Sequence, residues 1–283
     1  MVSPLAATVS TWGVWARGPQ LSAAAAVDIE ALGFGTIWIG QSPPADLALV
    51  DELLAATTTL TVATGIVNIW SADAAAVGAS FRRIEERFPG RFVLGIGTGH
   101  PEATSDYAHP YEALSRYLDV LDDAGVPESS RVLAALGPRV LRLARDRSAG
   151  AHPYLVTPDH TRVARETLGA DRLLAPEHKA VVETDVERAR LLGRPAVEKP
   201  YLGLSNYLNN LRRLGWTDAD FADGGSDALI DALVAHGSAD EVAAQLRQHL
   251  DAGADHVCVQ IVTQSKTDSV VPGLRALAPA LFG

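Results

Sequence analysis

Apolar runs alternate with amphipathic segments along almost the whole chain. In the first half, each short apolar run is followed by a stretch in which apolar residues recur at helical spacing. The predicted strands cover residues 8–16, 36–40, 60–69 and 91–96, and the predicted helices cover residues 22–32, 46–57, 73–88 and 111–124. This alternation is typical of parallel strands joined by crossover helices.

The second half keeps this rhythm but contains one irregular region. Predicted strands cover residues 131–136, 152–156, 172–175 and 254–262, and predicted helices cover residues 138–147, 227–236, 240–252 and 273–281, with a further helix beginning at residue 162. Residues 183–216 favour extra helix. We therefore predict one α/β domain over residues 1–283, folded as a (β/α)8 TIM barrel with an inserted helical segment near strands seven and eight.

A doubly wound open sheet is the alternative architecture. Such a sheet usually has about five or six strands and places its phosphate-binding glycines after the first strand. In this chain the glycines Gly95, Gly97 and Gly99 follow the fourth predicted strand. The strand count and the place of the glycines therefore favour the barrel.

Charge and cysteine content restrict the partners and the compartment. The net charge of −10 acts against a general affinity for nucleic acid or for an anionic membrane, so we expect neither partner. The single cysteine, Cys258, excludes an internal disulfide framework. The first ten residues lack a secretion-signal pattern, and no apolar run approaches the roughly 18 residues of a membrane span. We expect a cytoplasmic protein.

In a barrel of this kind, functional residues lie where strands end and loops begin. The alternating glycines after strand four leave room for a planar or phosphate-bearing ligand to approach the backbone. Small residues fitted under a helix are the alternative explanation. Gly137-Pro138-Arg139 opens a helix whose N-terminal amides can hold an anion, although an ordinary helix start with proline explains the same motif.

Four tryptophans lie in or just beyond the first three predicted strands: Trp12, Trp15, Trp38 and Trp70. Together they can form the wall of a site for a flat aromatic ligand. Two of the four can instead belong to the core, since a large aromatic ring contributes much buried apolar area wherever it lies.

Four motifs together resemble the luciferase-like monooxygenase family, specifically its F420-dependent oxidoreductases, and are most similar to a mycobacterial-type subgroup. They are LGIGTGH after strand four, TGIVNIW after strand three, AHPYLVTPDHTRVAR around strand six and GADHVCVQ before the end of the chain. The resemblance runs from the first strand to about Val262 and is weakest over residues 183–216. It implies the same barrel that the strand rhythm predicts.

The resemblance also implies a deazaflavin or flavin ring at the carboxyl ends of the strands. It places a non-prolyl cis peptide in strand three, at Gly65-Ile66, whereas an ordinary trans strand with Gly65 at a bulge is the alternative. The expected cofactor-binding residues are Gln41, Gly65, Ile66, Asn68, Gly97, Thr98, Gly99, His100, Leu136, Gly137, Pro138 and Thr157. The expected substrate-binding residues are Trp12, Trp15, Trp70, Glu177, Asn206 and Tyr207.

The chain departs from this family at the positions for acid/base chemistry. Sugar-phosphate dehydrogenases of the family have Asp-His at the end of strand two and Glu after the strand-four glycines, where this chain has Gln41-Ser42 and His100. Glutamine cannot titrate, whereas an imidazole ordinarily titrates near pH 6.5 and can exchange a proton. We predict His100 as the catalytic residue; the alternative is that it only stacks on or hydrogen-bonds to the cofactor.

The remaining histidines are weaker candidates. His152 begins the sixth predicted strand, at the end of the barrel opposite the expected site. The pair Asp255-His256 has no third ligand at matching spacing, so we predict no metal.

The leading interpretation is an F420-dependent oxidoreductase that exchanges a hydride between the deazaflavin C5 and a small organic substrate. One alternative keeps the fold and uses FMN with oxygen, as the monooxygenases of the family do. Another is a cofactor-binding homologue without activity. The resemblance also implies a homodimer.

Overall fold

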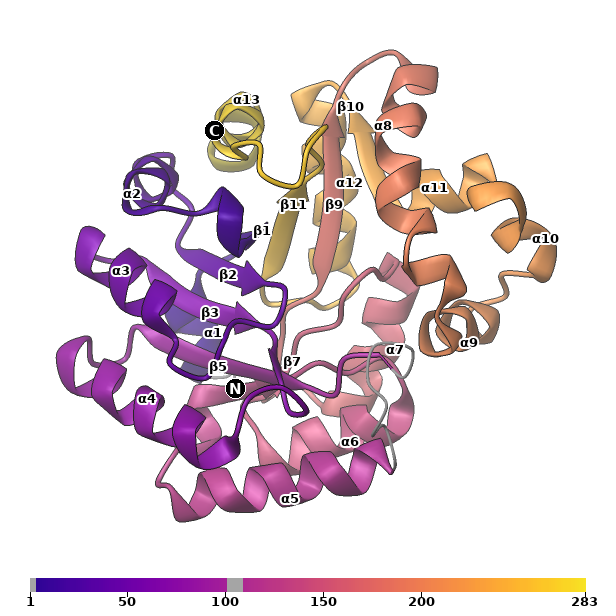
Figure 1. Ribbon diagram of the computed structural model, residues 1–283. Coiled ribbons are helices and arrows are strands. Elements are labelled where there is room, and N and C mark those ends of the chain that lie inside the picture. The colour runs from indigo at the N-terminus through magenta and orange to yellow at the C-terminus, as the bar shows by residue number, and fades with distance from the viewer. Residues whose placement is uncertain (1–3, 101–108) are drawn as a thin grey trace.

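All the paired strands run parallel in one curved sheet (Figure 1). The computed structural model describes residues 4–100 and 109–283. The strands are β1 (Trp12–Arg17), β2 (Thr36–Gly40), β3 (Thr61–Gly65), β4 (Val67–Asn68), β5 (Phe92–Gly97), β6 (Arg131–Leu133), β7 (Gly150–Ala151), β8 (Leu173–Leu174), β9 (Glu177–Val182), β10 (Val234–Gly237) and β11 (Val257–Ile261). Their order is β10-β9-β11-β1-β2-β3-β5-β6-β7-β8, with β4 paired to β5. The sheet forms a half-barrel.

Helices surround this sheet (Figure 1). Most alternate with strands: α2 (Ala23–Ala31), α3 (Ala48–Ala56), α4 (Ala74–Arg87), α5 (Pro110–Asp123), α6 (Pro138–Arg147), α7 (Pro158–Leu168), α12 (Ala239–Asp251) and α13 (Val271–Phe282). A short helix α1 (Pro4–Val9) precedes the first strand, and four helices lie between β9 and β10: α8 (Val186–Glu198), α9 (Ser205–Arg213), α10 (Asp218–Phe221) and α11 (Asp227–Leu233). Within the described ranges, no helix is long and apolar enough to cross a membrane.

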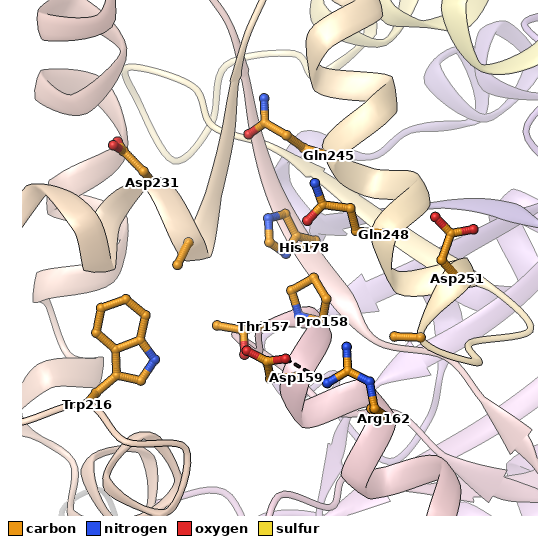
Figure 2. Close-up of a pocket in the computed structure, with 12 residues that line it drawn as sticks. Thr157, Pro158, Asp159, Arg162, His178, Trp216, Asp231, Gln245, Gln248 and Asp251 are labelled. Carbon is orange, nitrogen blue, oxygen red and sulfur yellow. Dashed lines mark hydrogen bonds and ion pairs between the residues drawn. The ribbon is translucent and has the colours of Figure 1, made fainter.

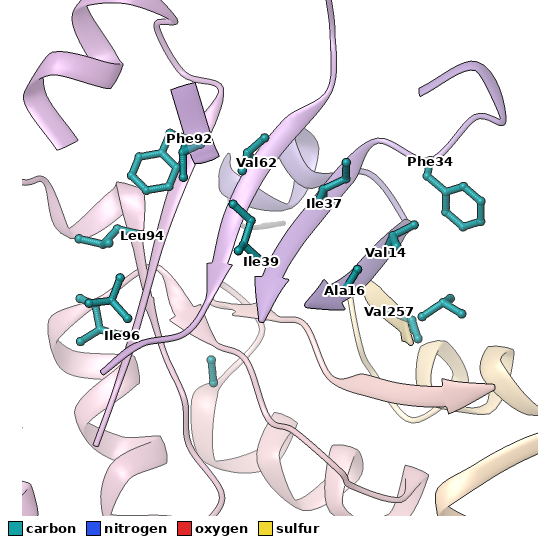
Figure 3. Packing of buried hydrophobic residues seen from close by; sticks show 14 of the residues in the cluster. Val14, Ala16, Phe34, Ile37, Ile39, Val62, Phe92, Leu94, Ile96 and Val257 are labelled. Carbon is teal, nitrogen blue, oxygen red and sulfur yellow. The ribbon is translucent and has the colours of Figure 1, made fainter. Parts of the chain in front are cut away.

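The strands are buried on both faces because their side chains alternate between two apolar layers. Val14, Ile37, Val62 and Leu94 belong to the outer layer, which packs strands against helices (Figure 3). The intervening positions form an inner cluster with one residue from each of seven strands: Trp15, Trp38, Ala63, Val93, Val132, Leu173 and Cys258. Since strands far apart in the order meet in this one cluster, the sheet must curve around it.

Polar side chains at the predicted positions begin several helices. The hydroxyl of Ser22 accepts a hydrogen bond from the amide of Ala25 at 3.2 Å, and the Asp73 carboxylate accepts one from the amide of Ala76 at 2.9 Å. These contacts satisfy amides that lack partners inside the helix. They explain why α2 and α4 begin where the sequence predicts.

Several predicted boundaries are wrong. The first strand begins at Trp12, because residues 4–9 form α1, and residues 152–156 are not a strand, since β7 ends at Ala151. The strand β9 was not predicted, because Glu177 and Lys179 interrupt its apolar pattern. Residues 234–237 form β10 rather than the end of a helix, an ambiguity that a short apolar run does not resolve.

The carboxylate of Glu30 joins α2 to the start of β3. It accepts hydrogen bonds from the amides of Thr58, Thr59 and Leu60, at 3.0, 2.7 and 2.9 Å. Burial opposes the charged form, but the bonds from Thr59 and Leu60 outweigh it and lower the pKa of Glu30 to about 2.

We expect Glu30→Gln to lower the free energy of unfolding at pH 7 by about 1–2 kcal/mol, because an amide oxygen accepts these bonds more weakly than a carboxylate. The pKa of Glu30 in the folded protein lies below its ordinary value of 4.5, so the contribution is present above pH 4.5 and is lost as the pH falls toward 2. Urea unfolding at pH 7 and pH 3 measures both effects. Glu86→Gln, at an exposed position of α4, is the control. Equal stability of the two variants at pH 7 would contradict this assignment.

Candidate functional site

A cavity of about 530 Å³ opens at the carboxyl ends of the strands. Residues that follow β1, β2, β3, β5, β6 and β7 line it, together with residues of the α8–α9 region and Lys266 after β11. Because parallel strands all end at the same edge of the sheet, side chains far apart in sequence meet here. We call this space the mouth cavity.

A second cavity, of about 450 Å³, lies between α7, α11 and α12 (Figure 2). Asp159, Asp231 and Asp251 line it, and the one arginine on its wall, Arg162, is paired with Asp159 at 2.7 Å. Its walls come mainly from the helical layer rather than from strand ends. The mouth cavity is therefore the better candidate for a functional site.

One wall of the mouth cavity is formed where β3 ends. The peptide bond Gly65-Ile66 is cis, which confirms the prediction made for this bond. The indole N–H of Trp15 donates a hydrogen bond to the carbonyl of Gly65 at 3.2 Å. Both residues line the cavity, so this bond holds β1 and the end of β3 together at its wall.

The glycines after β5 make room for neighbouring side chains that line the cavity. A Cβ at Gly97 would lie 2.9 Å from the Cβ of Ala134 and 3.1 Å from the side chain of Ile66. Gly99 has a φ of 59°, and a Cβ there would lie 2.7 Å from the side-chain nitrogen Nδ2 of Asn68. Close packing of the chain itself thus accounts for both glycines.

His152 lines the mouth cavity, so its predicted position at the opposite end of the barrel is wrong. Its Nδ1 lies 2.7 Å from the carbonyl oxygen of Ala175, and its ring stacks on Trp38 with 4.2 Å between centroids. Burial lowers the pKa of His152 to about 4. The imidazole is therefore neutral at pH 7, with Nδ1 donating and Nε2 able to accept. Among the described residues, Nε2 is buried and has no hydrogen-bond partner.

Basic side chains surround the cavity in a protein whose net charge is −10. Arg17, Arg139, Lys199 and Lys266 line it, and the described lining residues include no carboxylate. Arg139 pairs with Glu112 at 2.9 Å and lies 3.8 Å from the centroid of the Tyr111 ring. This local excess of positive charge favours an anionic ligand or ligand group.

Aromatic rings from the segment after β9 cover the cavity. The ring of Tyr201 lies 5.0 Å from that of Tyr207, and the imidazole of His100 lies 6.1 Å and 5.5 Å from these two rings. The ring of Tyr154 packs against Trp15 at 5.2 Å and against Tyr201 at 5.3 Å. These contacts join four parts of the chain in one aromatic wall.

The structure brings most of the predicted site residues together at this cavity. Those that line it are Trp15, Gln41, Gly65, Ile66, Asn68, Thr98, Gly99, His100, Leu136, Gly137, Asn206 and Tyr207. Residues that line it without having been predicted include Arg17, His152, Tyr154, Lys199, Tyr201 and Lys266. The spacing of His152 and Tyr154 could have indicated that both line the cavity. The two residues are two positions apart, and alternate residues face the same side of an extended chain.

The other predicted residues lie elsewhere. Trp12 is in the outer core, and Thr157 caps α7 and lines the second cavity. Gly97 and Pro138 are next to lining residues but are not on the wall themselves.

Trp70 and Glu177 are also absent from the wall of the mouth cavity. The indole N–H of Trp70 donates to the carbonyl of Thr98 at 2.8 Å. Glu177 is fully buried in β9, because its position on the sheet turns the side chain into the interior. Among the described residues, no group of three or more histidine, cysteine or acidic side chains is placed to hold a metal ion.

A half-barrel of parallel strands with a cavity at its carboxyl ends defines the class of TIM-barrel-like folds, whose ligand sites lie at that end. Within that class, the model of the luciferase-like monooxygenase family matches residues 17–256. The chain belongs to this family. A search of curated proteins found no match.

Solved structures share the fold at low sequence identity. An F420-dependent secondary alcohol dehydrogenase in complex with an F420-acetone adduct is 14% identical, with a TM-score of 0.71 over 95% of this chain and 99% of that one. The F420-dependent tetrahydromethanopterin reductase of Methanopyrus kandleri is 16% identical, with a TM-score of 0.64 over 96% and 99%. The oxygenating constituent of 3,6-diketocamphane monooxygenase from Pseudomonas putida, in complex with FMN, is 15% identical, with a TM-score of 0.66 over 95% of both chains.

The buried histidines predict how stability depends on pH. Burial lowers the pKa of His152, His178 and His256 from 6.5 to about 4. Between these values the unfolded chain binds more protons than the folded protein, so the free energy of unfolding should fall as the pH drops from 6.5 to 4. Each fully realised shift is worth on the order of 3 kcal/mol.

Urea unfolding at half-unit intervals between pH 7 and pH 4 measures this dependence. His178→Asn should be less stable at pH 7 and should show a shallower fall, because one proton-linked group is missing. A free energy of unfolding that stays constant between pH 6.5 and pH 4.5 would rule out this explanation.

Proposed function

We propose that the protein is an F420-dependent oxidoreductase that transfers a hydride between C5 of the deazaflavin and a small organic substrate. The observation that carries this proposal is the basic, aromatic mouth cavity in a strongly acidic chain. F420 combines a flat ring with a phosphate and an acidic tail, so it needs both an apolar wall and local positive charge. The relatives of known structure include F420-dependent and FMN-dependent enzymes.

The start of α6 suits the phosphate group. The helix begins after Gly137, which lines the cavity. Because glycine has no side chain, this position supplies no side-chain acceptor for the first amides of the helix. Pro138 has no N–H, and the amides of Val140 and Leu141 donate to the carbonyl of Gly137 at 3.1 and 3.0 Å, which leaves the amide of Arg139 in the first turn. The positive end of the helix dipole favours an anion there. Arg139 adds a positive charge on the same turn. Arg213 is a second nearby cation: one of its guanidinium nitrogens lies 3.7 Å from the position that a Cβ would take if Gly137 had a side chain.

The opposite part of the cavity suits the ring and the substrate. Trp15, Ile66 and Tyr207 supply apolar wall, which excludes water from reacting groups. His152 Nε2 and Asn206 Oδ1 are buried atoms without a hydrogen-bond partner among the described residues, and both belong to residues of the cavity wall. They can accept hydrogen bonds from N–H or O–H groups of a ligand. When bound, the deazaflavin would supply or accept the hydride at C5.

His100 lines the cavity and is the residue for which the sequence predicts proton exchange. Gln41 also lines the cavity but cannot titrate. The rings of Tyr201 and Tyr207 flank the imidazole of His100, which fixes its place beside the aromatic wall.

The proposal includes a closed (β/α)8 barrel of a single domain, with α8 to α11 as the inserted segment. Closure is supported by backbone hydrogen bonds from the amide of Asp255 to the carbonyl of Leu174, at 3.0 Å, and from the amide of Cys258 to the carbonyl of Pro176, at 2.9 Å. These bonds join the β8–β9 segment to β11 across the remaining gap. Only Ala175 and Pro176 separate β8 from β9.

Cofactor titration tests the proposed function directly. We expect purified protein to bind F420 with a micromolar or lower dissociation constant, measured by the change in cofactor fluorescence, and to bind FMN at least tenfold more weakly. Anaerobic mixing of the reduced complex with a panel of carbonyl compounds should then reoxidise the deazaflavin. Tight FMN binding without F420 binding would instead favour the flavin monooxygenase chemistry of the family.

The role of α6 predicts a difference between two arginines of that helix. Arg139→Gln should weaken F420 binding roughly threefold to tenfold, the range expected when one exposed charge contact to an anion is lost. Arg142→Gln is the matched control, because Arg142 is exposed on the same helix and does not line the mouth cavity. The difference should shrink at high salt. Equal affinities of the two variants at low salt would place the anion elsewhere.

A further inference from the structure

A buried ion pair lies beneath the mouth cavity. Glu177 and Lys179 are alternate residues of β9, so their side chains point to the same face, and both side chains are fully buried. Lys179 Nζ lies 3.1 Å from Glu177 Oε1, and Glu177 Oε2 accepts a hydrogen bond from the amide of Leu155 at 2.9 Å. A buried pair of charges adds little stability compared with apolar side chains of the same size. Its presence calls for another explanation.

Hydrogen bonds connect this pair to the wall of the cavity. Lys179 Nζ donates to the hydroxyl of Tyr154 at 3.0 Å. The Tyr154 hydroxyl lies 3.1 Å from that of Tyr201 and 2.9 Å from Gln260 Oε1. Both tyrosines line the cavity. The chain Lys179–Tyr154–Tyr201 therefore runs without a break from the buried ammonium group to the place where a ligand can bind.

The direction of these bonds can reverse. In the arrangement described, Tyr201 donates to Tyr154, and Tyr154 donates to Gln260. Each hydroxyl can rotate, and it can both donate and accept. When Tyr154 turns its proton to the Tyr201 oxygen, the Tyr201 proton becomes available to a ligand, while Lys179 continues to donate to Tyr154.

The charge of Lys179 supports proton transfer along this chain. Its Nζ lies 4.2 Å from the centroid of the Tyr154 ring and 5.4 Å from that of Tyr201, where a positive charge stabilises an oxygen that has lost its proton. Burial raises the pKa of Tyr201 to about 12, so the hydroxyl holds its proton at neutral pH. Burial also lowers the pKa of Lys179, which makes its ammonium group a better proton donor.

We propose that Tyr201 is a catalytic residue that passes a proton to or from the oxygen of the substrate, with Tyr154 and Lys179 as positioning residues that supply that proton. The substrates are then carbonyl compounds and the corresponding alcohols. This inference rests on the proposed function, because the hydride comes from, or returns to, the deazaflavin. Under this inference Tyr201, and not His100, exchanges the proton of the substrate's oxygen, and His100 remains a residue of the cavity wall beside the two tyrosines.

The proposed step balances in both directions. The reduced deazaflavin, when bound, would supply the hydride to the carbonyl carbon. As the π-electron pair moves to the carbonyl oxygen, that oxygen takes the proton of Tyr201. The Tyr201 oxygen takes a proton from Tyr154, and Tyr154 takes one from Lys179, which becomes a neutral amine. After the alcohol leaves, one proton from water in the cavity refills the chain through Tyr201. Alcohol oxidation runs the same steps in reverse.

The test compares Tyr201→Phe with the wild type and with Tyr117→Phe. Tyr117 is a matched control, since it is a buried tyrosine of α5 that does not line the cavity. We expect Tyr201→Phe to bind F420 within twofold of the wild type by fluorescence titration. Its kcat for the best carbonyl substrate should fall about 100-fold or more, the usual effect of losing a proton donor, with a smaller change in KM. Tyr117→Phe should match the wild type in both measurements.

Two further variants examine the supply of the proton. Tyr154→Phe should lower kcat about tenfold and leave F420 binding unchanged. Lys179→Met alone leaves the Glu177 carboxylate buried without its partner and can prevent folding, so Lys179→Met/Glu177→Gln replaces both charges together. The double variant should also lose at least tenfold in kcat. A kcat within threefold of the wild type in Tyr201→Phe, or an equal loss in Tyr117→Phe, would overturn the proposal.

A binding measurement separates this inference from the proposed function. Cyclohexanone and methylenecyclohexane have similar shapes, but only the ketone accepts a strong hydrogen bond. We expect the wild type, without cofactor, to bind the ketone at least tenfold more tightly by saturation-transfer NMR, and Tyr201→Phe to lose this preference. If the wild type prefers the ketone but does not bind F420, the result would contradict the proposed function and still support the role of Tyr201 toward the substrate oxygen. Equal binding of both ligands by the wild type would contradict the role of Tyr201.

Discussion

The central constraint on this structure is that each parallel strand must supply side chains to two buried layers at once. Side chains alternate along a strand, so Val14 and Ala16 pack toward the helices while Trp15 points into the curved sheet. The same division holds along β2, where Ile37 and Ile39 flank Trp38. Large indole rings fill the interior, and the space that remains open is the cavity at the carboxyl ends of the strands. The location of the site is thus a consequence of how the interior is packed.

Several polar side chains enter this interior and are held there by hydrogen bonds. Trp38 donates its indole N–H to His256 Nε2 at 2.9 Å, and His152 is held by the carbonyl of Ala175. Both imidazoles are neutral because burial lowers the pKa of each to about 4. The pair of Lys179 and Glu177 differs, since it places two charged groups in the interior directly below the tyrosines of the cavity. The two imidazoles are therefore uncharged, whereas the pair of Lys179 and Glu177 places charge beside the tyrosines for which proton transfer is proposed.

The family relationship explains the fold better than it explains the chemistry. Relatives that share only 14–16% of their residues keep the same arrangement of strands, since the two-layer pattern constrains residue type and not residue identity. Side chains at the cavity are free of that constraint. Gln41 occupies a position where the family resemblance led us to expect a titratable group, while Tyr154, after β7, and Lys179, in β9, are joined by a hydrogen bond.

The sequence by itself determined the features that depend on local pattern. Alternation of apolar runs and amphipathic segments predicted the parallel sheet, and the strand Thr36–Gly40 and the helix Pro138–Arg147 have the predicted bounds. The strand ends located residues such as Asn68, His100 and Gly137 at the cavity. These successes share a cause, because hydrophobic periodicity and position at a strand end can be read from neighbouring residues alone. The cis bond at Gly65-Ile66 was expected on other grounds, from the family resemblance of the motif TGIVNIW.

Only the tertiary structure decided which distant residues meet. The sequence pattern placed His152 at the start of a strand, at the far end of the barrel. In the structure β7 ends before it, and the following segment lines the cavity. Lys179 is an unremarkable charge in the sequence, and its burial beside Glu177 and Tyr154 follows from the register of β9 against β11. Tyr201 reaches the same point from a helical segment. Local pattern fixes which face a residue can occupy, whereas strand register and the course of the chain between strands fix its neighbours, and those depend on packing across the whole sheet.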